Sequence, residues 1–162
     1  MRGAGDIQID VSDRQRAVRI DAAWLVRVAR RALARQAIDR AEISILLVGD
    51  RRMAALHEEW LGLAGPTDVI TFDLGGPDAS AEGRLQGDIV VSAETARRVA
   101  RELRWAPRHE VAYYVIHGLL HLAGHDDTDA VRRRAMRARE RVLMAAAGLP
   151  RPPRGRPGRA PA

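Results

Sequence analysis

The chain of 162 residues is long enough for one folded domain and too short for two, and it contains no cysteine, which excludes disulfide bonds and thiolate metal sites. Its formal net charge of +6 at pH 7 is compatible with a nucleic-acid partner but does not require one, because four of its arginines lie within residues 149–162. No apolar run reaches the roughly 18 to 20 residues of a membrane span and the N-terminus has no apolar signal-peptide region, so we expect a cytoplasmic protein that does not enter a membrane.

Hydrophobic periodicity predicts four strands and five helices in the order β-α-β-α-β-β-α-α-α. The strands are predicted over residues 6–11, 41–49, 66–74 and 85–92. The helices are predicted over residues 21–37, 51–62, 93–104, 107–124 and 126–148. This order indicates an α+β or mixed α/β fold with a small sheet of about four strands.

Residues at the helix ends support these boundaries. Asp21, Asp50 and Ser92 are predicted N-caps, Pro107 opens the fourth helix, and Gly124 ends it. We expect one domain over residues 1–148, and a disordered tail over residues 149–162, which are rich in Arg and Pro and poor in apolar residues.

The stretch "HGLLHLAGHDD", residues 117–127, carries three of the five histidines. Four residues separate His117 from His121, so on a helix both imidazoles lie on one face and can bind a common ion. Apolar residues surround them, and a buried imidazole needs a hydrogen-bond or metal partner. We therefore predict a metal site here, with Zn²⁺ as the expected ion because the ligands are imidazole and carboxylate without sulfur.

A third ligand must come from beyond this helix. In a continuous helix His125 would lie about 12 Å along the axis from His117, too far to share one ion with it. Gly124 allows the chain to turn back, after which His125, Asp126 or Asp127 can complete the site. Helix geometry alone does not choose among them.

The residue after the first histidine argues against a peptidase. In the zinc-protease motif H-E-x-x-H that position is the glutamate general base, whereas here it is Gly118.

Three stretches resemble the YbeY family of bacterial metal-dependent endoribonucleases and rRNA maturation factors. "HGLLHLAGHDD" is similar to the family signature H-G-x-L-H-L-x-G-Y-D-H, "PTDVITF" (66–72) to P-T-[DN]-V-L-S-F, and "GDIVVSAETA" (87–96) to a G-[DE]-I-x-I-S segment followed by Ala. The three motifs occur in the family's order, within residues 41–127. The resemblance implies an α+β fold in which a small mixed sheet packs with about five helices, with the metal-bearing helix near the C-terminal third.

The resemblance also implies a function. It predicts a single-strand-specific endoribonuclease that holds one zinc-like ion and acts in 16S rRNA 3′-end maturation and ribosome assembly. The implied partners are single-stranded rRNA, the small ribosomal subunit and its assembly factors.

By position, the resemblance implies the metal ligands His117, His121 and Asp127, which are also the implied catalytic residues. The family usually has His where this chain has Asp127, and Tyr where this chain has His125. We prefer Asp127 to His125 as third ligand, since a carboxylate oxygen binds Zn²⁺ at nearly the distance of an imidazole nitrogen. An anionic ligand would make the ion a weaker Lewis acid or favour a harder metal.

A second departure concerns phosphate binding. The family commonly carries Asn-x-x-[YW]-Arg before its P-T motif, and here His57 replaces the Asn and Leu61 the Arg. Any phosphate-binding arginine must lie elsewhere in this chain, and the sequence does not rank the candidates Arg84, Arg104 and Arg108.

Other polar residues have simpler interpretations. Thr67 and Asp68 are expected to cap the following strand, Asp88 to lie at the start of a strand, and Glu110 to be a surface residue in a first helical turn. His57 is expected to be either a solvated side chain or a site residue.

Two other functions compete with the nuclease. Because Leu61 replaces the usual Arg, the chain can instead be an RNA-binding assembly factor with weak or no catalysis and a structural metal. A metal-dependent hydrolase of another substrate is disfavoured by Gly118.

Overall fold

The computed structural model describes residues 5–153. Within this range the elements follow the predicted order. The strands are β1 (Ile7–Asp13), β2 (Arg40–Val48), β3 (Val69–Asp73) and β4 (Arg84–Ser92). The helices are α1 (Ala22–Arg35), α2 (Asp50–Leu61), α3 (Ala93–Leu103), α4 (Pro107–Leu122) and α5 (Ala130–Ala146). The predicted tail falls mostly outside the described residues.

The strands form one mixed sheet in the order β1-β2-β4-β3. β1, β2 and β4 run parallel, and β3 pairs antiparallel with β4 along one edge. The predicted α+β fold with a small mixed sheet and five helices is therefore confirmed for the described residues.

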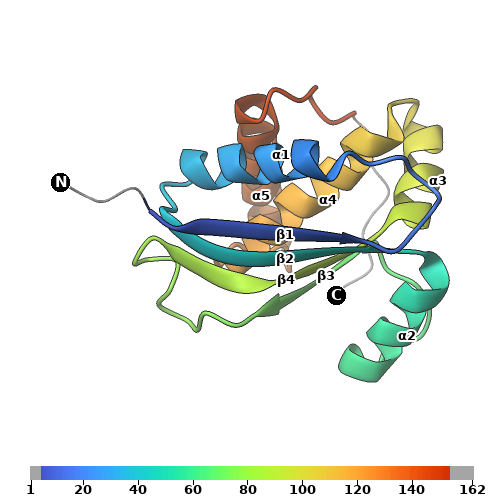
Figure 1. Cartoon of the computed structure of the whole chain (residues 1–162), viewed down its shortest axis with the longest axis horizontal. Coiled ribbons are helices and arrows are strands. Elements are labelled where there is room, and N and C mark those ends of the chain that lie inside the picture. The colour runs from blue at the N-terminus through green and yellow to red at the C-terminus, as the bar shows by residue number, and fades with distance from the viewer. Residues whose placement is uncertain (1–4, 154–162) are drawn as a thin grey trace.

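Helices cover the two faces of the sheet unequally. α1, α4 and α5 lie on one side of the sheet, and α2 lies on the other (Figure 1). The larger apolar core joins the inward-facing residues of the strands to these three helices. A smaller cluster beneath α2 consists of Val48, Met53, Leu56, Ile70 and Val90.

α4 is the most enclosed helix, because it packs against β3, β4, α1, α3 and α5. Its side chains are buried almost all the way round, from Glu110 to Leu120. Pro107 is its first residue, as predicted, and the helix ends at Leu122, two residues before Gly124. The core thus holds α4, and with it His117 and His121, in a fixed position on the sheet.

Gly118 sets how closely α4 approaches the sheet. A Cβ atom on residue 118 would lie 2.8 Å from Cγ2 of Ile89 and 3.2 Å from Cγ2 of Thr71. Both neighbours are branched side chains on strands, which cannot easily move aside. Any side chain after the first histidine, a glutamate included, would therefore require α4 or the strands beneath it to shift.

The predicted caps of α1 and α3 are correct, and that of α2 is wrong. Asp21 accepts hydrogen bonds from the backbone of Ala23 and Trp24, and Ser92 accepts one from Thr95. The N-cap of α2 is Gly49, and Asp50 is the first residue inside the helix.

Asp50 instead ties α2 to α3. Its carboxylate accepts hydrogen bonds from Ser92 Oγ and Thr95 Oγ1, each 2.6 Å long, and from Arg98 Nη1 at 3.1 Å. Burial raises the pKa of Asp50, but these three hydrogen bonds outweigh it and hold the pKa below its usual value.

Two side chains that the sequence analysis associated with the surface are buried. Glu110 is fully buried and accepts a hydrogen bond of 2.9 Å from Nε1 of Trp105, so the prediction of a surface residue is wrong. His57 is 4% exposed, and its Nδ1 lies 2.9 Å from the carbonyl oxygen of Gly65. A carbonyl can only accept, so His57 donates to the loop before Pro66 rather than to water.

The remaining expectations concern strand residues. Asp68 precedes β3 and its Oδ1 accepts from the backbone N–H of Val69 at 2.8 Å, in agreement with the capping role. Asp88 lies inside β4, paired with Phe72 and Ser44, and not at its start. No helix within residues 5–153 is long and apolar enough to span a membrane.

We predict that Gly118→Ala destabilises the protein. Helix propensity alone would favour Ala over Gly by about 1 kcal/mol, whereas overpacking a core costs about 1–3 kcal/mol. We expect the packing cost to win, with a net loss of up to about 2 kcal/mol in the free energy of unfolding, measured by urea denaturation. A gain in stability would contradict the close approach of α4 to the sheet.

Candidate metal centre

His117 and His121 lie one helical turn apart on α4 and face the same point. Their ring centroids are 4.5 Å apart and their Nε2 atoms 2.9 Å apart. His117 is 4% exposed and His121 is half-buried. The predicted pairing of the two imidazoles is therefore present in the structure.

The Nδ1 atoms of both rings are held by acceptors. His117 Nδ1 lies 2.6 Å from Oε1 of Glu140, and His121 Nδ1 lies 3.1 Å from the carbonyl oxygen of His125. A carbonyl or an ionised carboxylate can only accept, so we assign the proton of each neutral ring to Nδ1. Each Nε2 then carries a lone pair, and the two lone pairs face each other.

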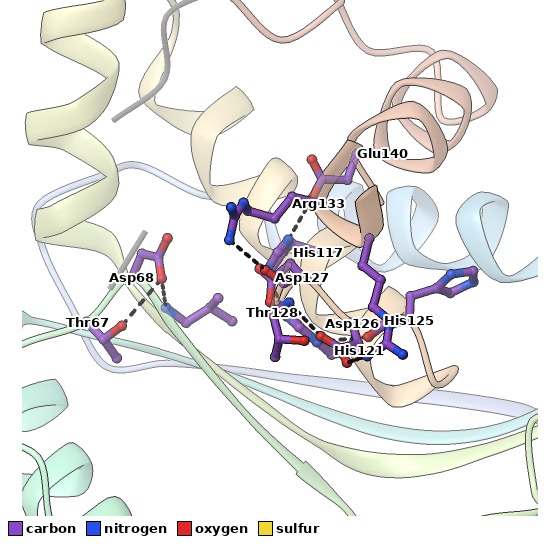
Figure 2. Close-up of polar contacts among 12 residues, drawn as sticks. Thr67, Asp68, His117, His121, His125, Asp126, Asp127, Thr128, Arg133 and Glu140 are labelled. Carbon is purple, nitrogen blue, oxygen red and sulfur yellow. Dashed lines mark hydrogen bonds and ion pairs between the residues drawn. The ribbon is translucent and has the colours of Figure 1, made fainter. Parts of the chain in front are cut away.

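Asp127 completes the cluster. Gly124 adopts a φ of +94°, which turns the chain back after α4 and brings the Asp127 carboxylate to the rings. Its oxygens lie 3.6 Å from Nε2 of His117 and 3.8 Å from Nε2 of His121. Figure 2 shows the three side chains converging from α4 and the loop before α5.

These three residues suit a divalent cation. One ligand atom from each of His117, His121 and Asp127 lies within 4.8 Å of the others. Two lone pairs 2.9 Å apart repel unless a proton or a cation lies between them. Two imidazole nitrogens and a carboxylate oxygen are ligands that Zn²⁺ accepts.

His125 takes a different position from the one that a third ligand requires. Its ring points away from the other two (Figure 2), and only its backbone carbonyl takes part, as the acceptor for His121. Burial lowers the pKa of the His125 imidazole, and the positive charge of Arg139 lowers it further.

Asp126 also points elsewhere. Its Oδ1 accepts from the backbone N–H of Thr128 at 2.6 Å, and its Oδ2 from Arg132 Nη1 at 3.0 Å. Of the three residues that the sequence left open, Asp127 is the one whose side chain reaches both rings.

Sequence reasoning missed Glu140 and Tyr113. The Glu140 carboxylate is 2% exposed and accepts from both His117 Nδ1 and the Tyr113 hydroxyl. A signal was present, because Glu140 follows Met136 by four residues and precedes Leu143 by three, on the buried stripe of an otherwise arginine-rich helix. A carboxylate on a buried stripe requires a hydrogen-bonding partner.

The arginines that the sequence analysis considered lie away from the cluster or are paired. Arg84 forms an ion pair of 2.5 Å with Glu82. Arg108 lies over Trp24 in the first turn of α4, about 20 Å from His121 by the helical rise, and Arg104 comes just before that helix.

Two other arginines contact the loop that carries Asp127. Arg133 is exposed and donates to the Asp127 carbonyl oxygen at 3.4 Å, while Arg132 pairs with Asp126. Positive charge therefore borders the cluster at the start of α5.

Comparisons with known proteins point to one family. The family profile described as Endoribonuclease YbeY matches residues 8–148. A relative named Endoribonuclease YbeY from Anaeromyxobacter sp. (strain Fw109-5) is 50% identical over 109 residues, covering 67% of this chain and 56% of the relative. One of the same name from Micrococcus luteus is 38% identical over 135 residues, covering 79% of this chain and 85% of the relative.

A solved structure has a similar fold. The solution structure of TM1509 from Thermotoga maritima superposes with a TM-score of 0.60 at 23% sequence identity, covering 86% of this chain and 89% of that one. At this identity the likeness supports the fold alone.

We predict that metal binding depends on Asp127 and not on the His125 ring. The Zn²⁺ affinity of the full chain, measured by competition with a chromophoric chelator, should fall by more than about 100-fold in His121→Ala and Asp127→Asn, since removal of a ligand costs more than loss of an outer partner. His125→Ala is the matched control and should bind like wild type, because its backbone carbonyl remains. A loss in His125→Ala as large as that in Asp127→Asn would identify His125 as the third ligand.

Proposed function

This chain belongs to the Endoribonuclease YbeY family, and on that premise we propose that it is a metal-dependent endoribonuclease, which hydrolyses phosphodiester bonds in RNA. The family match over residues 8–148 and the relatives of that name support the activity. The observation that carries the proposal is the pair of opposed Nε2 atoms 2.9 Å apart, with the Asp127 carboxylate beside them.

We propose His117, His121 and Asp127 as the metal ligands and as the catalytic residues. A divalent ion, when bound there, supplies a Lewis acid that polarises a phosphoryl oxygen and acidifies water. The chain's own contribution is to hold both rings with Nε2 turned to the same point, through Glu140 and the His125 carbonyl. Arg133 adds positive charge at the rim, which favours the approach of a phosphate group.

A single Zn²⁺ is the ion that we propose. The ligands are two imidazoles and one carboxylate, and the chain has no cysteine to offer a softer site. Because Asp127 is anionic where the family usually has His, we expect this centre to tolerate harder ions such as Mn²⁺ better than a three-histidine site would.

The substrate and partners are proposed from the family resemblance. They are single-stranded rRNA near the 3′ end of the small-subunit rRNA, and the small ribosomal subunit with its assembly factors, in the cytoplasm. The arginines beside Asp127 and those in residues 149–162 fit an RNA partner, since phosphate contacts are made chiefly by basic side chains. We further propose that residues 1–148 act as one domain.

The activity is tested on a labelled single-stranded RNA that matches the 3′ end of small-subunit rRNA. We expect the wild-type chain to cleave it, a chelator to abolish cleavage, and added Zn²⁺ or Mn²⁺ to restore it. His117→Ala should remain at least about 100-fold slower than wild type after metal is restored, because removing a group that acts with the reacting centre costs several kcal/mol.

The matched control is His125→Ala, which removes an imidazole whose ring points away from the cluster and leaves the carbonyl oxygen that holds His121. It should retain wild-type cleavage, and so exclude a general effect of purification. If the wild-type chain binds this RNA but never cleaves it with any added metal, the chain is a binding factor with a structural metal and the enzyme proposal fails.

A further inference from the structure

We propose that Glu140 is a positioning residue of this centre, whose buried carboxylate fixes the tautomer and the orientation of His117. The proposal rests on the proposed function in so far as it concerns metal binding, and it assigns to α5 a direct part in a site otherwise built by α4 and the loop after it.

The Glu140 carboxylate accepts hydrogen bonds from two side chains of α4. Oε1 lies 2.6 Å from Nδ1 of His117, and Oε2 accepts from the hydroxyl of Tyr113. Tyr113 and His117 are four residues apart on α4, so the two donors lie on one face of the helix and hold one carboxylate between them. Tyr113 is 3% exposed and Glu140 is 2% exposed, which makes this a buried polar network.

Burial of the Glu140 carboxylate determines which atom of His117 donates the hydrogen bond between them. A carboxylate removed from water must be hydrogen-bonded on both oxygens, and here each oxygen accepts from a donor on α4. An ionised carboxylate can only accept, so His117 must donate from Nδ1. The Nε2 lone pair is thereby turned toward His121 and Asp127.

Glu140 also places a second carboxylate at the centre, on the far nitrogen of His117. Carboxylates that hold the far nitrogen of a ligating histidine fix its orientation and raise its basicity, and their loss typically costs about 10–100-fold in metal affinity.

A purely structural role is the alternative, because the same carboxylate joins α4 to α5. The chain offers a variant that separates the two roles. Tyr113→Phe removes one hydrogen bond from Glu140 and weakens the link between the helices, but leaves the carboxylate on His117. Glu140→Gln keeps the size of the side chain and changes the acceptor on His117 from a carboxylate to an amide.

The first measurement is the tautomer of His117 in the metal-free wild-type chain, observed by long-range ¹H–¹⁵N NMR correlation. The proposal expects the proton on Nδ1 of His117, and expects a smaller excess of that tautomer in Glu140→Gln, because an amide oxygen is a weaker acceptor than a carboxylate oxygen. A proton on Nε2 in the wild-type chain overturns the proposal even if no variant folds.

The second measurement is Zn²⁺ affinity by competition with a chromophoric chelator, together with the free energy of unfolding of each variant. We expect Glu140→Gln to lose about 10–100-fold in affinity and Tyr113→Phe less than about 3-fold, although both lose stability. Equal losses of affinity in the two variants, or wild-type affinity in Glu140→Gln, overturn the positioning role.

The outcomes distinguish this proposal from the function on which it rests. If the wild-type chain binds Zn²⁺ and Glu140→Gln binds equally well, only the role of Glu140 fails. If the wild-type chain binds no metal, the metal-dependent nuclease fails, and the NMR tautomer alone decides what Glu140 does to His117.

Discussion

Two imidazole nitrogens that face each other at 2.9 Å are the constraint on which the site depends. Neither ring of the His117 and His121 pair can turn away without cost, because the Glu140 carboxylate and the His125 carbonyl each hold its Nδ1. Two lone pairs held together in this way repel unless a proton or a cation lies between them, and the Asp127 carboxylate lies beside them. A cation bound by the two rings and the carboxylate stabilises this arrangement. Metal binding is therefore linked to the folding of α4 and α5.

The rest of the fold keeps these groups in place. α4 is enclosed by the sheet on one side and by α1, α3 and α5 on the others, and Gly118 allows it to lie directly on Ile89 and Thr71. α5 brings Glu140 to His117, and the turn at Gly124 brings Asp127 to both rings. The residues of the centre are therefore close in sequence, except for Glu140. Only the packing of α5 on α4 brings Glu140 to the site.

Hydrophobic periodicity in the sequence predicts much of the fold, but it does not predict all of the site. The order of the elements and the His117–His121 pair depend on local patterns of 2.0 and 3.6 residues, which can be read directly from the chain. The choice among His125, Asp126 and Asp127 depends on dihedral angles after Gly124, which no local pattern determines. Glu140 lies on a different helix, and burial of a carboxylate on its apolar stripe was the one available clue. The same limit explains the error at Glu110 and the burial of His57, which the sequence left open; the hydrogen-bonding partners of both lie in neighbouring loops.

A crystal structure of the full chain grown with Zn²⁺, with anomalous data collected at the zinc edge, tests the central claim most directly. We predict one anomalous peak between the rings, at about 2.0–2.2 Å from Nε2 of His117, Nε2 of His121 and a carboxylate oxygen of Asp127. A peak bonded to the His125 ring instead of Asp127, or no peak between the two Nε2 atoms, would contradict it.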